Sequence, residues 1–182
     1  YPSTSLTGKM SMIWGTFVAH WTEPYRDCAR FLLNSWRPSL DGGDLEYSAY
    51  SVLQSFSMAF LSGHELDKLL SRYEESINWL HSSKQLQSRP LLDSWLQSTI
   101  NLVDRARVVP AATGSVFDLP AELPGLISTG NKIAIAYSCL ADGIMAFLFA
   151  DHERAAERFA MVRRHEDQIF ASFMRSALEL YE

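Results

Sequence analysis

The sequence HELDKLLSRYEESINWLH, residues 64–81, carries the clearest folding signal in the chain. Its apolar side chains recur at intervals of three, four and seven residues, which places them on one face of an α-helix. They are Leu66, Leu69, Leu70, Tyr73, Ile77 and Leu80. Residues 44–60 repeat this spacing, and Asp44 is predicted to cap that helix because its carboxylate accepts hydrogen bonds from first-turn amides. Gly63 tolerates the left-handed backbone that ends helices, so an antiparallel helix hairpin is predicted.

The same periodicity extends over most of the chain. Pro24 suits a helix's first turn, Thr22 is predicted to cap that helix, and Asp151 is predicted to cap another. Alternation typical of β-strands never lasts more than a few residues, so we expect an all-α fold of about eight helices. The remaining helical stripes are predicted within residues 10–21, 25–36, 90–106, 133–148, 151–162 and 169–181. The aromatic residues on these stripes, most of the five tryptophans included, are expected to lie in the core.

One proline-containing stretch interrupts the helical pattern. Residues 108–124 contain three prolines, which favour an irregular connection over a continuous helix. We therefore expect a single helical domain over residues 1–182, with the first helix pairs in 1–107, an irregular crossover in 108–130 and the last helices in 131–182. Because the chain begins with Tyr1 and not Met, we expect it to be a piece of a longer protein.

Composition excludes several classes of protein. The chain has 182 residues, of which 47% are hydrophobic and 20% charged, as in ordinary globular proteins. Its net charge of -5 argues against a nucleic-acid partner, because binding to phosphates needs clustered Lys and Arg. No apolar run reaches the ~20 residues of a membrane span. Cys28 and Cys139 each lie in a helical stripe, so we expect buried free thiols and a reducing, cytoplasmic location.

Catalytic and metal-binding motifs are missing from the sequence. None of the five histidines belongs to a metal-ligand pattern such as H-E-x-x-H, and no G-x-S-x-G nucleophile elbow occurs. The run of charged residues from Glu153 to Asp167 mixes both signs and is expected to be a solvated helix face, with an arginine-rich docking patch as the alternative. We therefore predict a non-enzymatic segment with no catalytic residue, no cofactor and no metal.

Helix pairs with tight turns prompt a search for internal repeats. In the later pair, Gly143 lies in the first helix, Ala155 just inside the second and Phe159 one turn beyond. This order resembles the tetratricopeptide (TPR) repeat, in which small residues allow close helix approach and larger ones fill the space between neighbouring pairs. The resemblance implies that the antiparallel hairpins stack as a TPR-like α-solenoid.

A second resemblance concerns the order of three short strings. They are His20-Trp21-Thr22-Glu23-Pro24, the helix start after Gly43-Asp44, and Gly63-His64-Glu65-Leu66. Together they resemble the TPR-like middle region of large signalling proteins, in which a protein-kinase-like domain and an AAA-type ATPase module precede the helical region and GAF and histidine-kinase modules follow it. The resemblance implies a scaffold or relay segment. Its motif residues are expected to be structural: His20, Trp21, Pro24, Gly43, Asp44, Gly63, Gly143, Ala155 and Phe159.

The sequence thus favours a protein-interaction or relay scaffold within a multidomain signal-transduction ATPase or sensor kinase. Its expected partner is a protein or peptide, or flanking domains of the same chain, bound on the concave face of stacked helices. One alternative is an all-α small-molecule-binding or catalytic domain with a pocket near residues 108–124. Another is an architectural spacer that binds no ligand.

Overall fold

The computed structural model describes residues 3–83, 88–104 and 111–182, and side chains from Leu6 onward. Within these residues the fold is all-α, as predicted, and the only β-type pairing is an isolated bridge between Thr113 and Asp118. The helices group into two compact units, residues 1–89 and 90–182. Helical periodicity is local, so it does not reveal which helices share a core.

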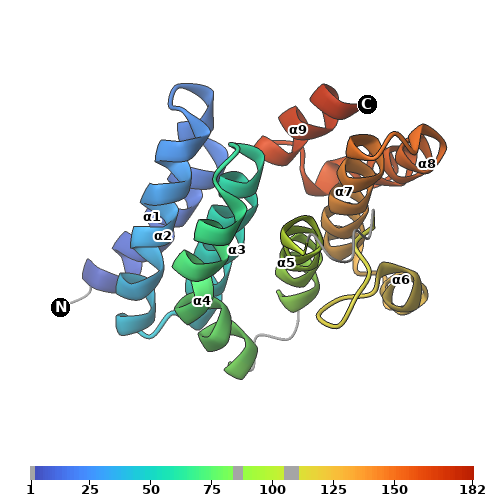
Figure 1. Cartoon of the computed structure of the whole chain (residues 1–182). Coiled ribbons are helices and arrows are strands. Elements are labelled where there is room, and N and C mark those ends of the chain that lie inside the picture. The colour runs from blue at the N-terminus through green and yellow to red at the C-terminus, as the bar shows by residue number, and fades with distance from the viewer. Residues whose placement is uncertain (1–2, 84–87, 105–110) are drawn as a thin grey trace. The chain divides into compact units, whose positions relative to one another are not determined.

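Unit 1 consists of four helices joined by short turns (Figure 1). They are α1 (Ser3–Phe17), α2 (Tyr25–Asp41), α3 (Leu45–Leu61) and α4 (Leu66–Ser82), with a short 3-10 helix, η1 (Ala19–Trp21), after α1. Helix α2 packs against both α1 and α3, and α3 packs against α4. The predicted hairpin of residues 44–81 is therefore present as α3 and α4.

The turns of unit 1 follow the predicted chemistry with one exception. The Asp44 carboxylate accepts a hydrogen bond from the Tyr47 amide at 3.2 Å, which caps α3 as expected. Gly43 and Gly63 adopt φ angles of 80° and 71°, the left-handed region that favours glycine. The prediction that Thr22 caps α2 is wrong, because its hydroxyl donates backward to the Ala19 carbonyl and Pro24 occupies the cap position.

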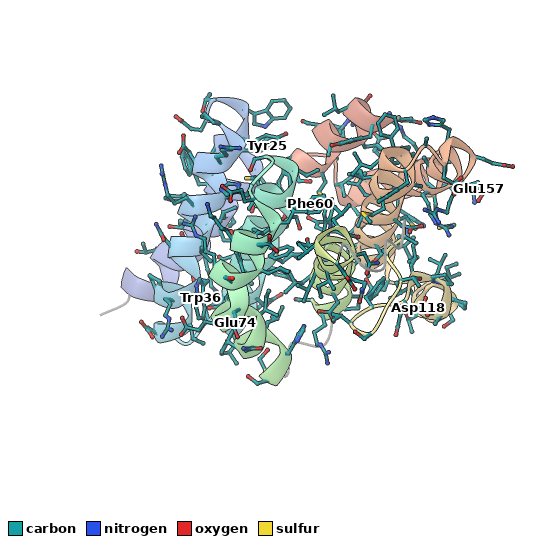
Figure 2. The ribbon with its side chains drawn as sticks, viewed as in Figure 1. Tyr25, Trp36, Phe60, Glu74, Asp118 and Glu157 are labelled. Carbon is teal, nitrogen blue, oxygen red and sulfur yellow. The ribbon has the colours of Figure 1, made fainter. Side chains whose placement is uncertain are left out.

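Three helices of unit 1 are joined by one buried hydroxyl network. Ser55 on α3 hydrogen-bonds the Ala29 carbonyl of α2 at 2.6 Å and also the hydroxyl of Tyr73 on α4. The Tyr73 ring meets Phe56 edge to face at 5.3 Å between centroids. Burial raises the pKa of Tyr73 to about 12, so its hydroxyl remains a neutral donor at physiological pH. At the far end of α2, Trp36 (labelled in Figure 2) packs on Trp79.

Unit 2 contains the remaining helices. They are α5 (Arg89–Val103), α6 (Leu119–Ser128), α7 (Lys132–Leu148), α8 (His152–Arg163), the 3-10 helix η2 (Glu166–Gln168) and α9 (Phe173–Tyr181). Helices α7 and α8 form an antiparallel hairpin, and α6 packs on α7. Asp151 caps α8 as predicted, since its carboxylate accepts from the Arg154 amide at 3.3 Å.

Helix α6 corrects the expected irregular crossover of residues 108–130. Residues 108–110 lie outside the described part of the chain, but residues 119–128 are helical. Pro120 stands in the first turn, where its missing amide hydrogen costs no intrahelical bond. Pro124 lies inside the helix and removes only one such bond. The prolines were therefore compatible with a short helix.

None of the helices in the described ranges has both the length and the apolar composition to cross a membrane.

Candidate functional site

Helix α1 packs on α2 through its small residues. A Cβ atom added at Gly8 would lie 2.9 Å from the Ser39 Cα, and one added at Gly15 would lie 2.7 Å from a methyl carbon of Leu32. Real Cβ atoms do not approach other atoms so closely, so only glycine allows this spacing of the two helices. Met12, Thr16 and Ala19 share the buried side of this segment.

Five large apolar residues of α1 lie on the opposite side and are exposed. Leu6 is 62% exposed, Met10 57% and Trp14 42%, and Ile13 and Phe17 are exposed to a similar degree as Trp14. We call Leu6, Met10, Ile13, Trp14 and Phe17 the α1 stripe. The sequence predicted the aromatic residues of this segment, Trp14 and Phe17 among them, as core, and that prediction is wrong because the glycine face is the one that packs. Trp21, on η1, is also exposed, at 69%.

A groove runs beside the α1 stripe, toward α2. Its volume is about 450 Å³. Its floor includes Trp14 and Phe31, whose rings meet edge to face with centroids 5.0 Å apart. We call it the apolar groove, and its lining residues are Leu6, Thr7, Met10, Ser11, Trp14 and Phe31.

A second hollow shares Trp14 and Phe31 with the first. It has a volume of about 300 Å³ and carries two carboxylates, from Glu23 and Asp27. We call it the acidic pocket, lined by Trp14, Glu23, Asp27, Cys28, Arg30, Phe31 and Asn34. Burial, and then the charges of Glu23 and Asp27, raise the pKa of the Cys28 thiol, which disfavours a thiolate in this position.

The first group of predicted motif residues surrounds the start of α2. The His20 ring is buried and stacks on Trp21 at 4.9 Å between centroids, with Tyr25 (labelled in Figure 2) 6.5 Å away. Neither ring nitrogen of His20 forms a well-shaped hydrogen bond to the described part of the chain. Burial lowers the pKa of His20, and the Thr16 backbone only partly offsets this effect. Pro24 precedes the first residue of α2.

The remaining motif residues lie in two other places. Gly43, Asp44 and Gly63 form the turns at the two ends of α3, and none of them lines the groove. Gly143, Ala155 and Phe159 all lie in the α7–α8 hairpin of unit 2, where a Cβ atom at Gly143 would lie 2.6 Å from the Phe159 ring. The structure therefore brings Gly143 and Phe159 into close contact, leaves Ala155 buried on the same hairpin, and gathers the nine motif residues into no single site.

Unit 2 contains a buried polar cluster that sequence reasoning missed. The Asp142 carboxylate accepts hydrogen bonds from the Arg158 side chain and the Ala112 amide, both at 2.8 Å. The Gln97 side-chain oxygen accepts from the Val116 amide at 2.8 Å. A further member, Asn101, donates to the Ala111 and Thr113 carbonyls. These hydrogen bonds connect residues 111–118 to α5 and α7. The segment therefore has a structural role in the region where the alternative function expected a ligand pocket.

The charged run of α8 has two environments. Glu157 points away from α8 into solvent, as Figure 2 shows, in agreement with a solvated face. Arg158 instead reaches the buried Asp142. Arg163 forms ion pairs with Glu166, Glu179 and Glu182. Its guanidinium is therefore already paired within the chain, whereas an arginine-rich docking patch would need it free to bind a partner. Its hydrogen bond to Glu179 holds the pKa of that carboxyl below the usual value.

Within the described residues, no three His, Cys, Asp or Glu side chains cluster closely enough to hold a metal ion. No protein-family model, curated protein or solved structure matches the chain.

Proposed function

We propose that the chain is a non-catalytic protein-interaction scaffold whose binding surface is the α1 stripe with its apolar groove. One observation carries this proposal: five large apolar side chains are exposed along one face of α1, while the opposite face packs on α2 through glycines. Contiguous exposed apolar surface on a folded protein commonly marks an interaction site. The close glycine contacts keep α1 in one position, so the stripe is a preformed surface.

The proposal extends to the cellular role that the sequence resemblance implies. The scaffold would belong to a multidomain signalling ATPase or sensor kinase, and its partner would be a protein, a peptide or a flanking domain of the same chain. Binding would relay a state between neighbouring modules. Cys28 and Cys139 are both free and buried, which supports a reducing, cytoplasmic compartment.

The experiment replaces the two most exposed residues of the stripe. The double variant Leu6→Glu/Met10→Glu is titrated by calorimetry with each purified flanking module, in parallel with the unmodified chain. Burying a large apolar side chain contributes about 1.5–3 kcal/mol, so the affinity should fall at least ~10-fold. Leu180→Glu is the matched control, because Leu180 on α9 is 77% exposed and lies outside the stripe.

The variants must remain folded for this comparison. Exposed positions tolerate such changes within about 0.5 kcal/mol of unfolding free energy, which urea denaturation checks. If no flanking module binds the unmodified chain, or if the double variant binds as well as the Leu180→Glu control, the proposal is wrong. A complete absence of binding would favour the architectural spacer.

A further inference from the structure

The apolar groove and the acidic pocket share two walls, Trp14 and Phe31. Along α1, Leu6, Met10, Ile13 and Phe17 are spaced by four, three and four residues, the repeat with which two helices pack along a seam. This seam runs over the 12 residues from Leu6 to Phe17, about 16 Å at ~1.5 Å per residue, which is roughly three helical turns. The surface therefore matches the length and spacing of a short amphipathic helix laid in a groove.

The acidic pocket adds a charge requirement at one end of that surface. Arg30 compensates only Asp27, at 2.7 Å, and the Glu23 carboxylate forms no ion pair with any described residue. One negative charge thus remains beside the half-exposed faces of Trp14 and Phe31. A carboxylate next to aromatic faces attracts the ammonium or guanidinium group of a side chain, both by charge and through cation–π contact.

Resting on the proposed function, we infer that the apolar groove binds an amphipathic helix of a partner protein, and that a Lys or Arg of that helix enters the acidic pocket. The apolar residues of the helix lie on Leu6, Met10 and Trp14. Its basic residue lies beyond the Trp14–Phe31 pair, where it meets Glu23.

The charge of the acidic pocket favours a basic amphipathic helix over two other possible occupants of the groove, a second copy of the chain and a membrane surface. The only basic residue in the described part of α1 is Lys9, which pairs with Asp44 at 3.0 Å and lies over the Tyr47 ring. The α1 helix of a second copy would therefore bring no free cation to the pocket. A membrane surface is disfavoured because interfacial helices present Lys and Arg to anionic headgroups, whereas this surface presents Glu23 and Asp27.

The test is a selection from phage-displayed helices of defined pattern. Each peptide of about 18 residues, roughly five turns, has an alanine-based helix with four sites at i, i+3, i+4 and i+7 randomised among apolar and polar residues. One further site, a turn beyond, is randomised among Lys, Arg, Gln, Glu and Leu. We expect apolar residues at the four sites and Lys or Arg at the fifth, with affinities then measured by fluorescence anisotropy of the enriched peptides.

Variants of the chain test whether Glu23 causes the preference for peptides with Lys or Arg. Glu23→Gln should weaken binding of the Lys or Arg peptide about fivefold and leave its Gln counterpart unchanged. Glu74→Gln is the matched control, because Glu74 (labelled in Figure 2) is an exposed carboxylate of α4 outside both hollows. Leu6→Glu/Met10→Glu should abolish enrichment of both peptides.

The possible outcomes separate this inference from the proposed function. Apolar enrichment with no basic preference, or a preference that Glu23→Gln does not remove, overturns the role of the acidic pocket and leaves the scaffold proposal intact. No enrichment over the Leu6→Glu/Met10→Glu variant overturns the helix-binding inference, and the titration with flanking modules then decides the scaffold proposal. A dimer in sedimentation experiments that the same double variant dissociates identifies a second copy as the occupant and also overturns it.

Discussion

The α1–α2 and α7–α8 pairs both use glycine to bring two helices close together, but they place their large apolar residues differently. At Gly143 the space above the glycine is filled by the buried Phe159 ring. At Gly8 the nearest residue is Ser39 and at Gly15 it is Leu32, with Phe31 next at 3.3 Å, while the side chains of the α1 stripe are exposed. A close helix contact made by small residues leaves the apolar surface of the large ones available for binding. The two pairs thus show how similar sequence patterns yield a core in one place and an exposed surface in another.

The largest expected effect concerns the aromatic residues of the two pairs. Phe159→Ala should lower the free energy of unfolding by about 3–5 kcal/mol, because it leaves a cavity over Gly143. Trp14→Ala should cost about 1 kcal/mol or less, since that side chain is already partly in water. Urea denaturation followed by circular dichroism measures both values. Equal costs at the two positions would show that the α1 stripe is part of the core.

A smaller effect is expected at the glycine itself. Gly143→Ala should cost about 1–3 kcal/mol, because the new methyl group meets the Phe159 ring. Gly125→Ala on α6 is the matched control: no atom lies within 4 Å of its added Cβ, so the higher helix propensity of alanine should stabilise the chain by up to about 1 kcal/mol. Thermal melting compares the two variants. If both raise the melting temperature, the α7–α8 contact is looser than described.

The smallest effect is a pH dependence that belongs to unit 1. Burial lowers the pKa of His20, so the folded chain binds its proton less readily than the unfolded chain does. The contribution of His20 to the free energy of unfolding is therefore fully present above the ordinary histidine pKa of about 6.5, and it is lost as the pH falls below that value. His20→Gln, which takes up no proton, should show a smaller loss of the urea midpoint between pH 7.5 and 5.5. An unchanged loss would exclude His20 as its source.

Local signals in the sequence were sufficient for the fold class. The spacing of Leu69, Tyr73 and Ile77 fixes the inward face of α4, and the carboxylates of Asp44 and Asp151 mark helix starts because capping involves residues only three positions apart. Helix α6 was missed because Pro120 and Pro124 are typical of turns as well as of first helical turns. Prolines alone do not distinguish these two cases.

The candidate site was harder to predict, since it depends on which face of α1 packs. The buried face carries Gly8, Met12, Gly15 and Thr16, whereas spacing alone favours the larger residues Met10 and Trp14 as core. Gly8 and Gly15, one opposite Ser39 and the other opposite Leu32, were the signal that could have indicated the buried face. The acidic pocket also combines residues from two helices, and periodicity along one helix contains no information about such pairs.

The segment from Ala112 to Phe117 has a consequence for how the chain tolerates length changes. Its amides donate to Asp142 and Gln97 instead of to a helix or a strand. Inserting or deleting one residue there would move these amides away from their acceptors. The buried side-chain oxygens of Asp142 and Gln97 would then have lost these hydrogen-bond donors. This segment has almost no regular secondary structure. It should nevertheless tolerate a change in its number of residues as poorly as a helical turn does.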